Sequence, residues 1–238
     1  MTFADLPARL AQVRGEIARR QAAGGWTHPV TIVAVTKGFG MDAVGAAVAA
    51  GLTDLGENRV QEALTKIDSE AGRRARWHLI GHLQRNKARF VPGRFVMVHS
   101  IASADLALEL ERRAGALGEE GRGKGEGQGL RALVQVNVAR EPQKSGCAPE
   151  DASAVARAVA RLEHVKLEGL MTMAPLTDDT EVQRRTFRAL RALRDRLQQE
   201  GLWVPTLSMG MSADYGTAVE EGATVIRLGT VLFGERTT

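Results

Sequence analysis

The sequence has few cysteines, aromatic residues and lysines. Its one cysteine, Cys147, excludes a disulfide within the chain and favours a reducing compartment, so we expect a cytoplasmic protein. Aromatic residues make up 4% of the 238 residues, which means that the core must be largely aliphatic. Six lysines stand against 26 arginines, and each lysine position is therefore more informative than usual.

Long hydrophobic runs are also missing. No stretch approaches about 18 consecutive apolar residues, which excludes a membrane-spanning helix. The N-terminal segment contains Asp5 and Glu16 and lacks the apolar centre of a secretory signal, so we expect neither a signal nor a transit peptide. The formal net charge is only +4, without a run of five or six basic residues, and this argues against nucleic acid as a partner.

What is present is a regular alternation of strand-like and helix-like segments. Leu6, Leu10, Val13 and Ile17 are spaced by three or four residues and predict a leading helix. The predicted strands then cover residues 30–36, 53–56, 76–81, 95–99, 131–138, 165–172, 203–208 and 224–229. Helical or short polar segments follow them, at residues 41–50, 59–70, 84–89, 103–117, 150–162, 178–199 and 213–221.

Eight strand–helix repeats in about 200 residues predict an α/β fold, a single (β/α)8 TIM barrel with an extra N-terminal helix. A doubly wound open sheet is the structural alternative, because a count of short strands from sequence can be wrong by about one or two. Composition shows no break that would mark a second domain, so residues 1–238 are predicted to form one domain. Residues 118–129, which are rich in glycine and charge, are predicted to form a flexible surface loop.

Lys37 follows a fully apolar predicted strand, at the end of a barrel strand where active sites lie. Burial of a lysine ammonium group disfavours its charged form and lowers its pKa, which releases a nucleophilic amine. Such an amine condenses with a carbonyl group to form a Schiff base. The alternative is a lysine that ends the strand and simply reaches solvent.

Two glycine-containing segments near the C-terminus suit an anion. Residues 208–212 follow the seventh predicted strand and lead into a helix at Ala213, and Gly229 with Thr230 follows the eighth. Backbone N–H groups at a helix start, with the hydroxyl groups of Ser212 and Thr230, would bind a phosphate. The glycines could instead serve turns and packing. Since strand eight pairs with strand one in a barrel, a phosphate here would lie beside the lysine, and a phosphorylated carbonyl compound is indicated.

Other combinations lack the spacing that their chemistry needs. His78 and His82 are four residues apart, but they lie across a predicted strand and Gly81 rather than on one helix, so we expect no metal site. Cys147 has no recognisable catalytic partner in the sequence.

Seven segments together resemble the YggS/PROSC family of pyridoxal phosphate homeostasis proteins: VTIVAVTKGF, LGENRVQEALTK, WHLIGHLQRNK, VHSI, QVNVAREPQKSG, LEGLMTMAP and LSMGMSADYGTAVEEGATVIRLGTVLFG. The resemblance extends over residues 30–236. It implies a barrel like the N-terminal domain of alanine racemase, with pyridoxal 5′-phosphate (PLP) as the cofactor. Members of the family buffer or deliver PLP without robust catalytic turnover, which makes apo-PLP enzymes the expected transient partners.

The resemblance also implies roles for individual residues. Lys37 would form the Schiff base with the cofactor aldehyde, Asn58 would lie beside the pyridine ring, and Arg227 would face the ring nitrogen. The phosphate would be held by Ser208 or Ser212 together with Gly210, Gly229 and Thr230. His82 departs from the family, in which many relatives have proline or a small residue, and this leaves the detail of the third loop open.

An arginine at the ring nitrogen cannot accept the pyridine proton, so the ring stays neutral and is a weaker electron sink than one held by a carboxylate. A racemase also needs an acid/base group on each face of the cofactor, and the sole tyrosine, Tyr215, is predicted on the helix after the phosphate loop. We therefore expect a monomeric PLP carrier with no catalytic residues. The alternatives are a weak PLP-dependent amino-acid racemase or decarboxylase, and a Schiff-base lyase or aldolase acting on a sugar phosphate.

Overall fold

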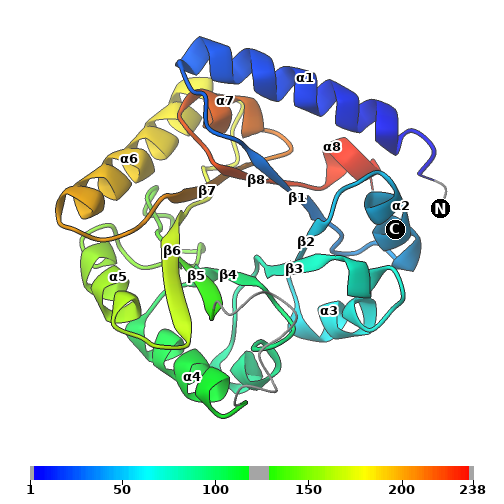
Figure 1. Ribbon diagram of the computed structural model, residues 1–238. Helices are drawn as coiled ribbons and strands as arrows, with labels where there is room; N and C mark the ends of the chain where they lie inside the picture. The colour runs from blue at the N-terminus through cyan, green and yellow to red at the C-terminus, as the bar shows by residue number, and fades with distance from the viewer. Residues whose placement is uncertain (1–2, 118–128, 236–238) are drawn as a thin grey trace.

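The strands form a closed parallel barrel in the computed structural model, which describes residues 3–117 and 129–235. In chain order they are β1 (Thr31–Val35), β2 (Asp54–Glu57), β3 (Arg76–Leu79), β4 (Met97–Ile101), β5 (Leu130–Gln135), β6 (Val165–Met171), β7 (Thr206–Met211) and β8 (Val225–Leu228). Each strand pairs in parallel with the next, and β8 pairs with β1 to complete the barrel (Figure 1). The predicted (β/α)8 fold is therefore confirmed. Residues 118–128 of the predicted flexible loop lie outside the described part of the chain.

Helices surround the barrel (Figure 1). They are α1 (Leu6–Gly24), α2 (Met41–Ala49), α3 (Val60–Ile67), α4 (Ala104–Gly115), α5 (Ala152–Ala160), α6 (Thr180–Gln199), α7 (Tyr215–Glu220) and α8 (Thr230–Phe233). Two short 3₁₀ segments, η1 (Gly72–Arg74) and η2 (Arg85–Phe90), lie on either side of β3 in the chain. The predicted extra helix is α1, which precedes β1 and packs against α7 and α8.

Buried apolar residues form one large core between the barrel and its helices. In β1, Val33, Ala34 and Val35 are all buried, because one face of a barrel strand meets the helices and the other meets the barrel interior. The apolar stripe predicted along α1 is buried in full. Patterning of apolar residues therefore accounts for both layers of the fold.

The barrel interior differs from this core, because its own apolar cluster is small. It consists of the buried residues Met97, Leu133 and Met171. Beside it lie buried polar side chains, among them His78, His99, Ser208 and Arg227. TIM barrels ordinarily fill this space with bulky branched residues, so these polar groups must be satisfied by one another.

The predicted boundaries of the seventh strand were wrong. We predicted residues 203–208, whereas β7 spans Thr206–Met211. Trp203 is 74% exposed and belongs to the irregular segment before β7. A glycine inside a strand pattern ordinarily argues against continuing the strand, which is why the prediction stopped before Gly210. Ser208 and Gly210 consequently lie inside the strand and not in the loop that follows. The short helix α8 was not predicted at all.

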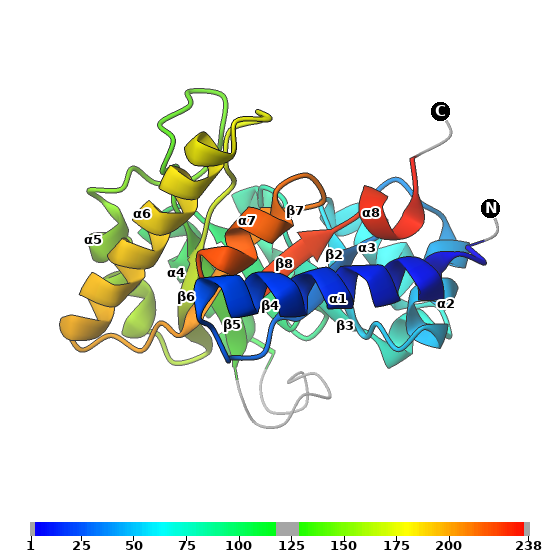
Figure 2. The ribbon, with the colours of Figure 1, turned by 90° about the horizontal axis from the view of Figure 1, so that it is seen from above.

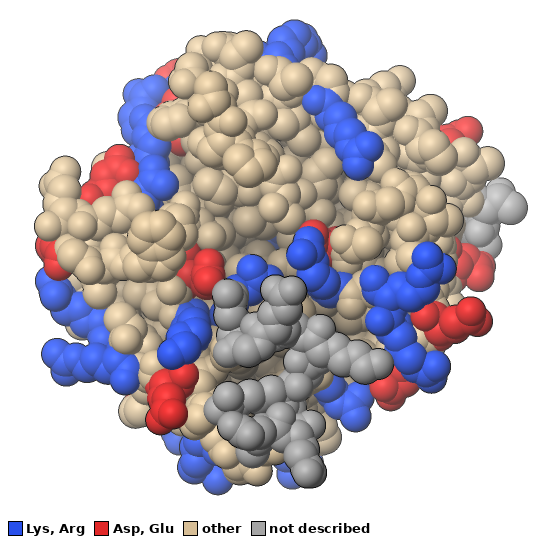
Figure 3. Space-filling view, in the orientation of Figure 1, with Lys and Arg blue, Asp and Glu red and all other residues tan. Residues whose placement is uncertain are grey.

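The strands begin on the face seen in Figure 1 and run away from the viewer. Figure 2 shows this from the side, with β8 pointing toward the edge where α8 lies. On the face where the strands begin, Lys and Arg side chains of the described residues alternate with Asp and Glu and form no continuous basic surface (Figure 3). None of the helices described combines the length and apolar composition needed to cross a bilayer.

An ion cluster on Glu221, the residue that ends α7, ties that helix to α6. The Glu221 side chain is 4% exposed and accepts hydrogen bonds from Arg184, Arg188 and Arg191. Although burial raises its pKa, the three guanidinium groups hold the pKa of this carboxyl below its usual value. Because α7 connects β7 to β8, this cluster fixes the end of α7 against α6 shortly before β8 begins.

Replacing Glu221 by alanine should lower the free energy of unfolding by about 2 kcal/mol, because it leaves three neighbouring cations without their shared partner. The three arginines keep contact with water, so the loss of unfolding free energy should be smaller than for a fully buried ion pair. Glu181→Ala is the matched control, since Glu181 pairs with Arg184 from a side chain that is 72% exposed. Urea unfolding of both variants checks this, and equal midpoints for the two would contradict it.

Candidate functional site

Lys37 lies in the turn directly after β1, at the C-terminal end of the barrel. Alternation along β1 puts Val33 and Val35 on the side that faces the barrel interior and Ala34 on the side that meets the helices. Val35 approaches Gly229 after β8, where an added Cβ would be 3.7 Å from the valine Cβ. This contact places the end of β1 beside the end of β8, as the sequence predicted. Lys37 itself is half-buried.

The backbone on both sides of Lys37 is held by charged residues of α3. Lys66 Nζ donates a hydrogen bond to the carbonyl oxygen of Thr36 at 2.8 Å. The N–H of Gly38 donates to Glu62 Oε1, also at 2.8 Å. Lys66 and Glu62 are themselves paired at 3.0 Å. One ion pair therefore fixes the two peptide groups that flank the candidate Schiff-base lysine.

Glu57 supports the same ion pair from β2. Its Oε1 accepts from Lys66 Nζ and from Thr36 Oγ1, each at 2.6 Å. Burial is complete and raises the pKa of this carboxyl, although both donors oppose the shift. Glu57 Oε2 meets no partner among the described residues. The sequence reasoning did not identify Glu62 or Lys66, and their four-residue spacing on a helix was the available signal.

Asn58 follows β2 directly and is exposed at the same end of the barrel. It rests against Gly81, where an added Cβ would lie 2.3 Å from the carbonyl oxygen of Asn58 and 2.7 Å from its side-chain Oδ1. Glycine at position 81 is therefore required for Asn58 to occupy this place. His82, the next residue, is exposed.

Arg227 lies on β8 with its side chain fully inside the protein. It is 4% exposed, and burial lowers its pKa to about 10, against a weaker opposing attraction from Asp214. Its Nη1 donates to Ser208 Oγ at 2.6 Å, and its Nη2 donates to the carbonyl oxygen of Thr172 at 3.0 Å. Among the described residues no carboxylate is hydrogen-bonded to it, so an anionic or acceptor ligand would find a buried donor here.

Ser212 collects two backbone N–H groups at the beginning of α8. Its Oγ accepts from Gly229 at 3.1 Å and from Val231 at 3.3 Å. Thr230 lies between these two residues and is exposed. We predicted the anion cradle from the segments after the seventh and eighth strands together, and the two converging N–H groups belong to the turn after β8. Backbone donors that meet at one oxygen are suited to a phosphate oxygen.

Gly210 has a packing role that the sequence did not reveal. Its φ of +95° is unfavourable for other residues, and an added Cβ would lie 2.6 Å from the Cβ of Ala218 in α7. The missing side chain lets β7 and α7 approach each other. Ser208, two residues earlier, is completely buried and bonds to His99 Nδ1 at 2.9 Å as well as to Arg227. Of the two serines, Ser212 therefore has the geometry suited to a phosphate, and Ser208 serves Arg227.

His78 and His99 are also buried in the barrel interior, and His99 is connected to Arg227 through Ser208. Both are completely or almost completely buried, and burial lowers the pKa of each, with His99 well below its usual value. They are held 2.9 Å apart through His78 Nδ1 and His99 Nε2. Neither is part of a group of three or more potential metal ligands in the described chain. Cys147 is buried too, and burial raises the pKa of its thiol to about 11.

Known proteins resemble this chain over nearly its full length. The family model for the N-terminal domain of alanine racemase matches residues 14–237. The pyridoxal phosphate homeostasis protein of Pseudomonas aeruginosa is 42% identical over 236 residues, which cover 99% of this chain and 96% of that protein. The chain belongs to the YggS/PROSC family.

Solved structures agree with this assignment to the YggS/PROSC family. PipY of Synechococcus elongatus, solved with PLP bound, is 36% identical with a TM-score of 0.81, and the match covers 96% of this chain and all of PipY. An alanine racemase of Clostridium difficile superimposes with a TM-score of 0.72 at 17% identity, over 98% of this chain and 60% of the racemase. The second likeness shows the shared barrel and no more.

Gly210→Ala should destabilise this YggS/PROSC protein by about 2 to 4 kcal/mol, because alanine meets both an unfavourable φ and the Cβ of Ala218. Gly15→Ala is the control, since an added Cβ at this position of helix α1 meets nothing within 4 Å. That variant should stay within about 1 kcal/mol of the native protein. Thermal unfolding measures both, and equal midpoints would show that Gly210 has no packing role.

The buried histidines predict loss of stability in weak acid. Because their pKa values are lower in the folded than in the unfolded state, the unfolded chain binds more protons as the pH falls below about 6.5. Each such histidine should steepen the fall in unfolding free energy by up to about 1.4 kcal/mol per pH unit. His99→Leu should therefore show a shallower fall than Met97→Leu between pH 7 and 5, measured by urea unfolding, and parallel curves would contradict this.

Proposed function

We propose that this protein binds PLP and takes part in PLP homeostasis by buffering or delivering the cofactor. The observation that carries the proposal is the presence, at one end of one barrel, of a lysine, a buried arginine and a pair of converging N–H groups. These are Lys37, Arg227 and the N–H groups of Gly229 and Val231. PLP has an aldehyde, a ring nitrogen and a phosphate, and each has a matching partner in this set.

The fit can be stated group by group. Ser212 Oγ and the two N–H groups that it collects would hold the phosphate, with Thr230 at the same turn. Arg227 would donate a hydrogen bond to the ring nitrogen, since it can only donate and its charge lacks a hydrogen-bonded carboxylate among the described residues. Asn58 would lie beside the ring. Gly210 and Ser208 would act indirectly, by shaping β7 and by holding Arg227.

When bound, PLP supplies an aldehyde that condenses with a lysine amine and a ring that can stabilise negative charge. The protein's own contribution begins at Lys37, whose backbone is held by Lys66 and Glu62 on both sides. Arg227, as a donor, would hold the ring nitrogen without a proton. A ring kept neutral in this way would favour retention of the cofactor over chemistry that passes through a carbanion.

We further propose that the protein has no robust turnover. A racemase needs a second acid/base group facing Lys37, and the one tyrosine of the sequence does not suit this role. Tyr215 packs against the large core outside the barrel, and the nearby charges that act on its phenol are Arg20 and Arg19 of α1. Burial raises the pKa of this phenol, so even less of the phenolate that would act as the base is present at neutral pH.

Incubation with PLP followed by borohydride reduction should place a covalent adduct on Lys37, located by mass spectrometry of peptides. Lys37→Ala should lose the adduct. Lys166→Ala is the matched control, because Lys166 is exposed at the opposite end of the barrel, and it should keep the adduct at native yield. An unmodified native protein, or an equal yield in Lys37→Ala, would contradict PLP binding at this site.

The same preparation separates a carrier from an enzyme. Amino acids incubated with the loaded protein in deuterium oxide should exchange their α-protons no faster than with free PLP. Rapid exchange would establish a weak racemase or decarboxylase instead. Trapping of a sugar phosphate on Lys37 in place of PLP would favour a Schiff-base lyase. Sedimentation of the loaded protein tests the monomeric state that we predict.

A further inference from the structure

A continuous series of hydrogen-bonded side chains crosses the barrel interior from Arg227 to Asp54. Arg227 Nη1 is bonded to Ser208 Oγ at 2.6 Å, and this oxygen lies 2.9 Å from His99 Nδ1. His99 Nε2 is 2.9 Å from His78 Nδ1, and His78 Nε2 is 3.0 Å from Asp54 Oδ1. We call these five residues the interior network. They come from five strands, β8, β7, β4, β3 and β2.

The two ends of the interior network fix the direction of every hydrogen bond in it. A guanidinium group can only donate, and an ionised carboxylate can only accept. Asp54 is ionised, since hydrogen bonds from His78 and Arg76 outweigh the effect of burial and lower its pKa. A neutral histidine has one donor and one acceptor nitrogen, so the direction set at Asp54 passes unchanged through both rings.

The direction assigns each proton. His78 donates from Nε2 to Asp54 and accepts at Nδ1. His99 donates from Nε2 to His78 and accepts at Nδ1 from the hydroxyl of Ser208. The Ser208 oxygen is thereby left with its lone pairs toward Arg227, from which it accepts. All four bonds are satisfied at once, and reversing any ring would put two donors or two acceptors together.

We propose that Asp54, His78, His99 and Ser208 are positioning residues that hold the guanidinium group of Arg227 in the orientation needed at the cofactor ring nitrogen. This inference rests on the proposed PLP function. The Ser208 hydroxyl could rotate freely if His99 did not accept its proton, and Arg227 would then lose its fixed acceptor. The network also gives Asp54, at the N-terminal end of the barrel, an effect on a site at the C-terminal end.

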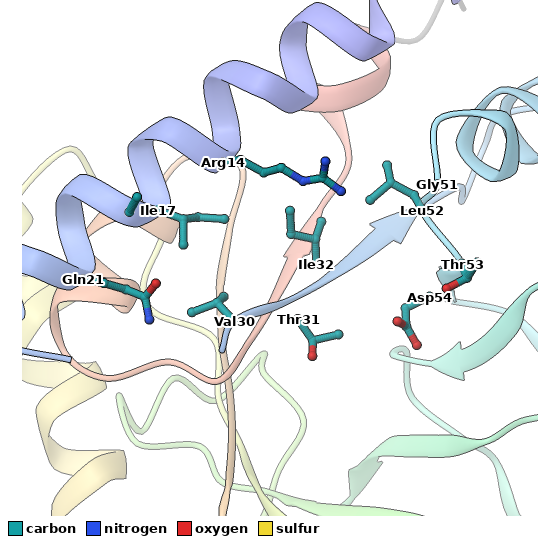
Figure 4. A pocket seen from close by; sticks show the side chains of 11 residues that line it. Arg14, Ile17, Gln21, Val30, Thr31, Ile32, Gly51, Leu52, Thr53 and Asp54 are labelled. Carbon is teal, nitrogen blue, oxygen red and sulfur yellow. The ribbon is translucent and has the colours of Figure 1, made fainter. Parts of the chain in front are cut away.

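Asp54 borders a cavity. A space of about 360 Å³ lies between α1 and the beginnings of β1 and β2, with Asp54, Arg14 and Gln21 among its lining residues (Figure 4). This cavity is at the opposite end of the barrel from Lys37. Open space therefore borders position 54 on the side of α1, while the Asp54 carboxylate itself is hydrogen-bonded to His78 and Arg76.

The proton positions are measured directly on the protein without cofactor. Long-range ¹H–¹⁵N spectra of the imidazole rings distinguish the two neutral tautomers and the charged form. We expect His78 and His99 to be neutral at pH 7 with the proton on Nε2 of each. A proton on Nδ1 of either ring, or two protons on either ring, would overturn the proposed direction.

Three variants measure the effect on the cofactor. Asp54→Leu removes the terminal acceptor, and PLP should dissociate about tenfold faster, as expected for loss of a buried hydrogen-bond partner. Asp54→Asn keeps a carbonyl acceptor for His78 Nε2 and should restore the rate to within about threefold of native. Met97→Leu changes the same interior outside the network and should leave the rate unchanged.

Native dissociation from a folded Asp54→Leu protein would overturn the proposal, as would equal losses in Asp54→Leu and Asp54→Asn. An equal loss in Met97→Leu would also do so, because it would show a general loosening of the interior. If the native protein forms no PLP adduct on Lys37, the proposed function fails, but the imidazole spectra still decide whether the interior network exists. The two failures are therefore distinguishable.

Discussion

A positive charge buried in the centre of the barrel is the constraint on which the rest of the structure depends. Removing a guanidinium group from water costs several kcal/mol unless its N–H groups find acceptors. Arg227 receives them from Ser208 and from the carbonyl oxygen of Thr172, while the carboxylate that acts on its charge, Asp214, is not hydrogen-bonded to it. The polar side chains of the interior follow from this need. They replace the branched apolar residues that a TIM barrel ordinarily holds there.

The backbone of Lys37 is held by a separate ion cluster on the outer side of the same barrel. Lys66, Glu62 and Glu57 form an ion cluster between β2 and α3 that bonds the peptide groups before and after Lys37. These contacts fix the backbone at the position of Lys37, and a fixed attachment point favours the orientation that a lysine amine needs to capture an aldehyde.

These two supports explain how a barrel shared with alanine racemase can serve homeostasis. The fold places the ends of β1 and β8 side by side. The fold alone, however, does not determine which chemistry occurs there. With the cofactor placed as we propose, a donor at the ring nitrogen and the position of Tyr215 outside the barrel would both favour holding the cofactor over transforming a substrate bound to it.

From the sequence alone it was possible to predict the eight strands, the leading helix and the residues that lie at the strand ends, because apolar periodicity and strand–helix alternation are local properties. The resemblance to a family added the cofactor and the roles of Lys37, Asn58 and Arg227. Tertiary structure alone decided that Ser208 faces Arg227 while Ser212 collects two backbone donors, that Gly210 packs on α7, and that Asp54 is connected to Arg227. Those relations depend on which side of a strand a residue occupies and on partners up to 109 residues away, and neither is encoded in a short stretch of sequence.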